Sequence, residues 1–216
     1  MQTKAENFIL EMQPISVYIY LLLCSLACIS MACSTAESAN NSNTVQSRSI
    51  EEAHEIVPEN QYNLGEKAPE FALTDLNGST KQLSDYEGKF LVLHFATTWC
   101  PFCNAEAPTL EKIAQQYKDQ DVEVLIIDVK EDPVLVQEKL QDRFNFSFPI
   151  LLDPEGKIAA SYAPEGVLPD LTRDEVVLAS NLLIDPQGKI QFYSLLDSKD
   201  FDAELVALQE RLHELL

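Results

Sequence analysis

FLVLHFATTWCPFC, residues 90–103, joins an apolar run to an amphipathic segment that extends to Tyr117. The apolar run predicts a buried central strand, and the segment from Pro101 predicts a helix with proline in its first turn. Cys100 and Cys103, two residues apart at this junction, can form and reopen a small disulfide. No other cysteine lies beyond residue 33, so they can pair only with each other or with another molecule. The stretch therefore predicts a redox centre.

The composition limits the class of protein. The 216 residues suffice for one domain of ordinary size and a leader, and 46% of them are hydrophobic, as a packed core requires. The formal net charge of -20 argues against nucleic acid as a partner, because phosphates need lysine and arginine to neutralise them. It also argues against a basic face that binds anionic lipid. We interpret the charge as a source of solubility, with a preference for basic partners as the alternative.

The N-terminal residues are typical of an export signal. An apolar segment from Ile15 to Ala32 ends in small residues and precedes a polar stretch rich in serine and asparagine. Ala32-Cys33-Ser34 resembles the cleavage region of bacterial lipoproteins, in which the cysteine carries the lipid. Cys28 is the alternative lipidation site, and an uncleaved membrane anchor or ordinary secretion also remains open. We expect a signal peptide at 1–32, a flexible tether at 33–61 and one domain at 62–216.

Strands and helices are expected to alternate along this domain. A hairpin should open it, with strands at 71–75 and 81–83 around the turn Asn77-Gly78. Further strands are predicted at 122–129, 148–152, 177–184 and 189–195, and helices at 101–117, 133–144, 158–162 and 200–216. Asp-Pro-x-Gly-Lys-Ile, at 153 and 185, predicts turns rather than an internal repeat or a calcium loop. The pattern predicts an α/β fold with a mixed sheet.

Several motifs resemble the thioredoxin-like superfamily, in particular the exported TlpA/ResA-like thiol-disulfide oxidoreductases of the AhpC/TSA-redoxin group. They are Gly65–Phe71, Leu83–Asp85 with Gly88-Lys89, Phe95–Pro108 and Leu183–Lys189. The resemblance extends from about residue 64 to 216. It implies a thioredoxin-like fold, with a central mixed β-sheet flanked by helices, the CxxC at a helix N-terminus and an N-terminal β-hairpin extension.

The two cysteines should have different roles. Only a thiolate attacks a disulfide, and a helix N-terminus stabilises negative charge. We therefore expect the pKa of Cys100 to fall below its free value of about 8.5, toward about 7. Cys100 is the predicted nucleophile. Cys103 lies one turn further into the helix and is the predicted resolving thiol, which attacks the mixed disulfide and releases the reduced client.

Three further residues are candidates for supporting roles. Glu106 matches the glutamate of the family's CxxCxxE pattern and can exchange a proton with Cys103, unless it is a solvated helix carboxylate. His94 precedes Cys100 by six residues, where it can shuttle protons or serve as a hydrogen-bonded core histidine. Trp99 can shield the disulfide and offer apolar surface to a client, or it can simply pack.

One departure from the family concerns the loop that faces the CxxC. Related folds place a cis-proline there, and Ala179 takes its place in this chain. The residues of this client-facing loop are Ala179 and Ser180. The irregular stretch at 163–174 can reshape the same surface.

The favoured function is an exported thiol-disulfide oxidoreductase that reduces client disulfides. A peroxiredoxin-like thiol peroxidase is the alternative, because Thr97 and Cys100 match Thr-x-x-Cys, although the usual preceding proline and activating arginine are missing. A lipid-anchored protein that binds thiol clients without turnover is another. No cofactor is expected, and no metal site, since His54, His94 and His213 lack ligand spacing. Expected partners are protein or small-molecule disulfides and a membrane thiol electron donor, at the periplasm-facing side of the cell envelope.

Overall fold

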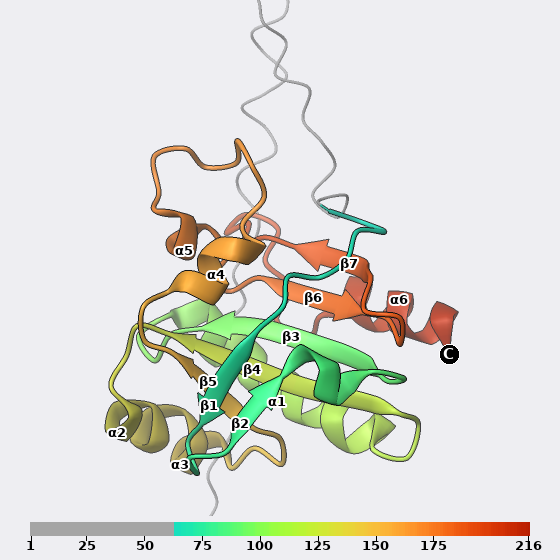
Figure 1. The fold of residues 1–216 in the computed structure, drawn as a ribbon, viewed down its shortest axis with the longest axis horizontal. Helices are drawn as coiled ribbons and strands as arrows, with labels where there is room; N and C mark the ends of the chain where they lie inside the picture. Colours follow the sequence, from blue (N-terminus) through green and yellow to red (C-terminus); the bar gives the residue numbers. More distant parts are fainter. Residues whose placement is uncertain (1–62) are drawn as a thin grey trace, which may run out of the picture. The chain divides into compact units, whose positions relative to one another are not determined.

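The computed structural model describes residues 63–216, which form a seven-stranded mixed sheet with helices on both faces. The strand order is β2-β1-β5-β4-β3-β6-β7 (Figure 1). The predicted signal peptide, tether and lipidation sites Cys28 and Cys33 lie outside the described residues. Within residues 63–216, no helix is long and apolar enough to cross a membrane.

The centre of the sheet is the strand pair β3 (Phe90–Ala96) and β4 (Val122–Val129). They are parallel, with Phe90 opposite Val122 and Ala96 opposite Asp128. Nearly all of their residues are buried, which explains why both strands are mostly apolar in the sequence. Helix α1 (Pro101–Tyr117) connects them, as parallel neighbours require. The predicted bounds of α1 and β4 are confirmed.

The two edges of the sheet are antiparallel hairpins. At one edge, β1 (Ala72–Asp75) pairs with β2 (Thr80–Gln82) and with β5 (Ile150–Asp153), which confirms the N-terminal hairpin. At the other edge, β6 (Asn181–Ile184) pairs with β3 and with β7 (Ile190–Ser194). This arrangement brings β6 directly against the strand that leads into the CxxC.

Two separate hydrophobic clusters cover the two faces of the sheet. One lies beneath α1, the helical segment at 133–144 and α6 (Val206–Leu215). That segment consists of α2 (Pro133–Val136), a π-helical turn η2 (Gln137–Gln141) and α3 (Asp142–Phe144). The other face carries the 3-10 helix η1 (Leu83–Tyr86), α4 (Lys157–Tyr162) and α5 (Arg173–Val176), the last two side by side in Figure 1.

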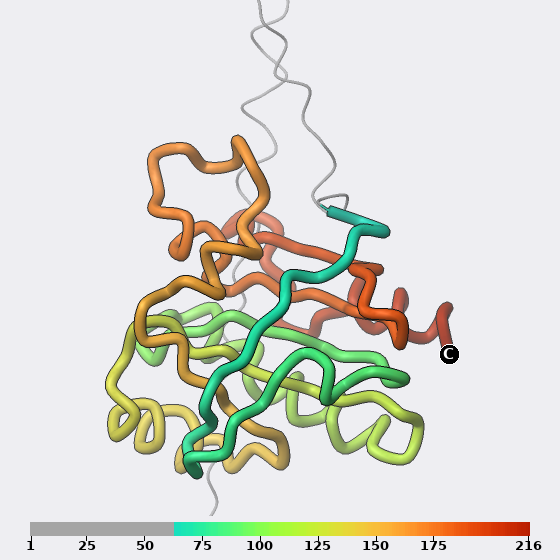
Figure 2. Tube along the Cα trace, viewed as in Figure 1, coloured from blue at the N-terminus to red at the C-terminus, as the bar shows by residue number. Residues whose placement is uncertain are grey.

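Several predicted bounds were wrong. The strand expected at 177–184 begins only at Asn181, because Val177–Ser180 form a turn after α5. The strand expected at 148–152 is Ile150–Asp153, and the terminal helix begins at Val206 rather than at residue 200. The irregular stretch from 163 is a long connection between α4 and α5, visible in orange in Figure 2.

Candidate active site

Cys100 occupies the N-cap of α1, directly beyond the carboxyl end of β3. Its backbone is extended (φ -71°, ψ 116°), and its Sγ accepts a hydrogen bond from the backbone N–H of Cys103 at 3.3 Å. A side chain at the N-cap normally satisfies such an unpaired helix N–H with oxygen, and here sulfur does so. Pro101 follows at the first helical position, where a proline costs no hydrogen bond.

The two sulfurs are both free thiols in this structure, but they differ in acidity. A hydrogen bond from the Cys103 thiol, assisted by the backbone N–H groups of Cys103 and Phe102, lowers the pKa of Cys100 to about 6 although burial opposes it. The same hydrogen bond, burial and the charge of Cys100 raise the pKa of Cys103. At neutral pH, Cys100 is therefore the thiolate and Cys103 the thiol, in the direction that the sequence predicted.

Two aromatic residues close to Cys100 in the sequence differ in exposure. Trp99 is 68% exposed, so its ring does not pack in the core, and the apolar surface that it offers to a client stays a prediction. Phe102 turns inward and makes an edge-to-face contact with Phe201, with ring centroids 4.8 Å apart. This contact ties the first turn of α1 to the segment before α6.

Beneath the cysteines lies a buried polar chain of His94, Asn181 and Glu106. The Asn181 Nδ2 amide donates to Glu106 Oε1 at 2.9 Å, and its Oδ1 lies 2.9 Å from His94 Nδ1. Because that oxygen can only accept, His94 must carry its proton on Nδ1. His94 Nε2 and Glu106 Oε2 have no hydrogen-bond partner. Each of the three residues is at most 3% exposed.

Burial determines the protonation states of Glu106 and His94 in this polar network. It raises the pKa of Glu106 to about 8, with a smaller opposing effect of the Asn181 hydrogen bond. Burial also lowers the pKa of His94 to about 4. The 3.7 Å contact between His94 Nδ1 and Glu106 Oε2 is therefore not an ion pair at neutral pH, since the histidine is neutral and the carboxyl is mostly protonated. These values favour the core-histidine interpretation of His94, and the burial of Glu106 excludes a solvated carboxylate.

Asn181 was not among the residues that the sequence selected. It stands opposite His94 in the antiparallel register of β3 and β6, and this pairing makes it the link between His94 and Glu106. Its one signal in the sequence is that a polar residue opens an otherwise apolar strand, Asn181–Ile184. Buried polar residues need partners, so such a position is a candidate for a network.

Ala179 lies beside the CxxC, next to the carboxyl end of β3. The Phe95 carbonyl accepts a hydrogen bond from the Ala179 N–H at 2.9 Å, and the Cys103 Sγ lies 3.9 Å from the same oxygen. Ala179 has a φ of 60°, a left-handed conformation that costs a residue with a Cβ about 1 kcal/mol. Both Ala179 and Ser180 are buried, so their role as a client-facing loop stays a prediction.

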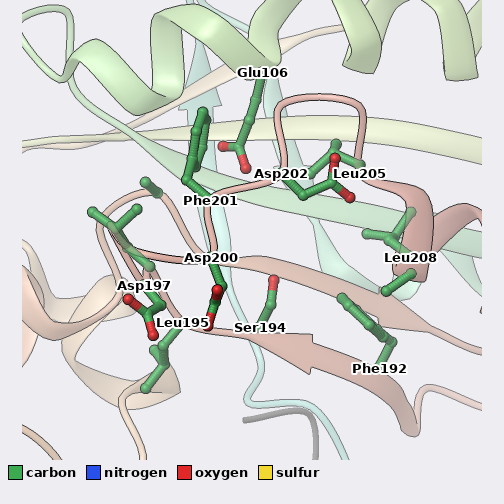
Figure 3. A pocket seen from close by; sticks show the side chains of 13 residues that line it. Glu106, Phe192, Ser194, Leu195, Asp197, Asp200, Phe201, Asp202, Leu205 and Leu208 are labelled. Carbon is green, nitrogen blue, oxygen red and sulfur yellow. The ribbon is translucent and has the colours of Figure 1, made fainter. Parts of the chain in front are cut away.

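A pocket of about 350 Å³ opens next to Glu106. Figure 3 shows the Glu106 side chain descending from α1 between Phe201 and Asp202. The walls are mainly apolar, with Phe192, Leu205 and Leu208 among them, and Ala179 also lines the pocket. Three aspartates surround the apolar walls, namely Asp197, Asp200 and Asp202. Within residues 63–216, no three His, Cys, Asp or Glu side chains are grouped as metal ligands.

An acidic thiol at a helix N-cap, a second thiol one turn further on and a mixed sheet with helices on both faces define a thioredoxin-like thiol-disulfide redox protein. Residues 64–193 match the AhpC/TSA family, and the chain belongs to this family.

The comparisons with individual proteins agree with this class. The chain is 38% identical over 128 residues to the thiol-disulfide oxidoreductase ResA of Geobacillus kaustophilus, covering 59% of this chain and 67% of that protein. It is 33% identical over 135 residues to ResA of Bacillus thuringiensis subsp. konkukian, covering 62% of this chain and 71% of that protein. These relatives and the site together make the protein a thiol-disulfide oxidoreductase.

The solved structures confirm the fold. A Bacteroides thetaiotaomicron protein described as a protein disulfide isomerase superposes with a TM-score of 0.61 and 29% identity, covering 73% of this chain and 92% of that one. The predicted α/β thioredoxin-like fold is thereby confirmed.

Proposed function

We propose that this protein is exported and reduces disulfide bonds in client molecules, with Cys100 as nucleophile and Cys103 as resolving thiol. The observation that carries the proposal is the opposite perturbation of the two thiols, which lowers the pKa of Cys100 to about 6 and raises that of Cys103. A thiolate beside a protonated thiol is the state from which a dithiol reduces a disulfide.

In the first step, the Cys100 thiolate attacks one sulfur of the client disulfide. The client S–S bond breaks, a mixed disulfide forms with Cys100, and the second client sulfur leaves as a thiolate that takes a proton from water. The loss of the Cys100 charge removes one of the causes that hold the Cys103 pKa high. The first step thus prepares Cys103 for the second.

In the second step, Cys103 loses its proton and attacks Cys100. Glu106 is our proposed acceptor of that proton, because a carboxyl with a pKa of about 8 populates both forms near neutral pH. The mixed disulfide breaks, the client leaves with two reduced sulfurs, and the enzyme keeps a Cys100–Cys103 disulfide. A thiol donor at the membrane then restores the dithiol by the reverse exchange.

A dithiothreitol-coupled insulin assay tests the reaction. The purified protein should accelerate insulin precipitation well beyond dithiothreitol alone, because Cys100 is mostly ionised at neutral pH. A redox titration against glutathione then gives the direction: about -270 mV is typical of a reductase and about -120 mV of an oxidant. A potential at the oxidising end would contradict client reduction.

The same assays separate the two alternatives. Rapid consumption of hydrogen peroxide without insulin reduction would establish a peroxidase. Stable mixed disulfides without turnover would establish a client-binding protein. The structure offers the peroxidase little support, since no lysine or arginine of residues 63–216 forms a hydrogen bond or salt bridge with Cys100.

The proposed location rests on the N-terminal sequence, with a signal peptide at 1–32, lipid on Cys33 and a tether to residue 61. A related structure, 26% identical with a TM-score of 0.53, is described as a secreted disulfide oxidoreductase of Mycobacterium tuberculosis. Labelled palmitate should enter the wild-type protein and the Cys28→Ala variant but not Cys33→Ala. If the label is instead lost in Cys28→Ala, the lipid is attached to Cys28. If none of the three proteins takes up the label, the protein has no lipid anchor.

A further inference from the structure

Asp128 is a buried carboxyl that the proposed reaction does not use. It lies at the carboxyl end of β4, and its neighbours in register are Ala96 of β3 and Leu152 of β5. The residue is 1% exposed, and neither carboxylate oxygen has a hydrogen-bond partner of normal geometry among the described residues. An ionised carboxylate without a well-aligned donor is costly to bury, so burial favours the protonated form of Asp128.

Glu131 lies three residues further on and holds the loop that leads to Cys100. It accepts hydrogen bonds from both the backbone N–H and the hydroxyl of Thr98, the latter at 2.7 Å. Thr98 therefore occupies both oxygens of Glu131 as acceptors. After burial, Glu131 is the group that acts most strongly on the Asp128 carboxyl, through its charge and its side chain. We call Asp128 and Glu131 the carboxyl pair.

The surroundings supply no positive charge that would neutralise two carboxylates. Within residues 63–216, neither member forms a salt bridge with a lysine or arginine: Lys130 pairs with Asp174, and Arg143 donates to Asn104. The buried titratable groups on the adjacent elements are His94 on β3, Cys100 at the N-cap of α1, Cys103, Glu106 and Tyr117 on α1 and Asp153 on β5, and the exposed Asp132 caps α2. None of these is in hydrogen-bonding contact with Asp128.

We propose that Asp128 keeps its proton and donates it to Glu131, so that the carboxyl pair shares one proton and fixes Thr98, and with it the loop before Cys100. Loss of that proton to water leaves two adjacent carboxylates without a cation, and their repulsion releases Glu131 from Thr98. The pair therefore positions the active-site loop at neutral pH and loosens it in alkali. Burial and the charge of Glu131 hold the pKa of Asp128 at about 8, against a smaller opposing effect of the Glu131 backbone N–H.

The accessibility of Cys100 reports on this loop. Cys100 is mostly ionised above its pKa of about 6, so a further rise in its reactivity cannot come from its own ionisation. The rate of alkylation by iodoacetamide, measured on the reduced full-length protein and assigned to Cys100 by mass spectrometry, should therefore rise in two stages. The second stage, several-fold between about pH 7 and pH 9, marks the release of the 4% exposed Cys100.

Four variants test whether the ionisation of Asp128 causes the second stage. Asp128→Asn still donates to Glu131 but cannot ionise, and should remove the second stage while keeping the first. Glu131→Gln loses an acceptor for Thr98 and should be fast at all pH values above the first stage. Glu106→Gln removes the other carboxyl with a pKa of about 8, and Asp119→Asn removes an exposed charge; both should keep the second stage.

The proposal is wrong if Asp128→Asn retains the second stage, or if Glu106→Gln alone abolishes it. An infrared measurement at neutral pH on the wild-type protein and on Glu106→Gln covers the case in which Asp128→Asn does not fold. A protonated-carboxyl band that survives in Glu106→Gln and disappears in alkali supports a neutral Asp128, and its absence contradicts one. Neither readout requires the protein to reduce a client, so both are independent of the proposed function.

Discussion

Cys103→Ser should convert the protein into a trap that holds its client through a disulfide to Cys100, whereas Cys100→Ser should lower insulin reduction to the rate of dithiothreitol alone. A serine hydroxyl at position 100 would not attack a disulfide, and the remaining thiol of Cys103 is only 2% exposed, so a client disulfide does not reach it. In Cys103→Ser, the first exchange proceeds but no thiol remains to resolve the mixed disulfide. Non-reducing electrophoresis with a disulfide-containing client distinguishes the two.

A second replacement of Cys103 tests why Cys100 is acidic. The first cause of its low pKa is the hydrogen bond from the Cys103 side chain. A serine hydroxyl can donate to Cys100 Sγ, and an alanine cannot, so Cys103→Ser should keep the pKa of Cys100 low and Cys103→Ala should raise it. The backbone N–H of residue 103 remains in both variants. The absorbance of the thiolate measured against pH gives the Cys100 pKa of each variant. In the electrophoresis experiment, a trapped client in Cys100→Ser instead of Cys103→Ser would show that the roles of the two cysteines are reversed.

The parts of the fold that depend on local sequence were predictable. The proline at the first position of α1, the apolar stripe of that helix and the mostly apolar run of β4 each specify an element within a few residues. Glu106 was selected because it matches the family's CxxCxxE pattern and its spacing places it near the Cys103 face of the helix, and that face is buried.

The turn before β6 could not be predicted in this way. Val177 and Ala179 are apolar and buried, as strand residues would be, but Ala179 has a φ of 60° and donates a hydrogen bond to the distant Phe95 carbonyl. A long-range hydrogen bond of this kind overrides the local pattern. Ala179 therefore has a conformation that only the tertiary structure specifies.

The network residues were missed for a related reason. Asn181, Asp128 and Glu131 acquire their roles from strand register and from one long-range contact, that of Glu131 with Thr98. Acidic and amide residues at strand ends are common in any sequence, so no spacing rule selects these three. The burial of Asn181 and Asp128 distinguishes them, and it is visible only in the fold.

The same burial predicts that the reduced protein loses stability as the pH rises from about 5 to about 8. Glu106 and Asp128 have raised pKa values of about 8 when folded, so over this range the folded state holds two protons that the unfolded state has released. Stability from such groups is complete below their unfolded pKa and is lost as the pH rises through the folded pKa. His94 and Cys100 have the opposite effect on stability. Below about pH 6.5 the unfolded state holds one proton more at His94, and above about pH 6 it holds one proton more at Cys100, so each of them increases the stability as the pH rises.

The net difference is about one proton, which corresponds to a loss of about 1.4 kcal/mol of unfolding free energy per pH unit. Comparison with Asp128→Asn isolates one carboxyl and cancels the groups that the two proteins share. The free energy of unfolding of the variant relative to the wild type should increase by about 4 kcal/mol from pH 5 to pH 8, as an upper limit for one fully retained proton. Glu106→Gln should change the slope in the same direction, and Asp119→Asn should leave it unchanged. Urea unfolding in dithiothreitol measures all four proteins, and parallel pH curves for Asp128→Asn and the wild type would show that Asp128 is ionised in the folded state.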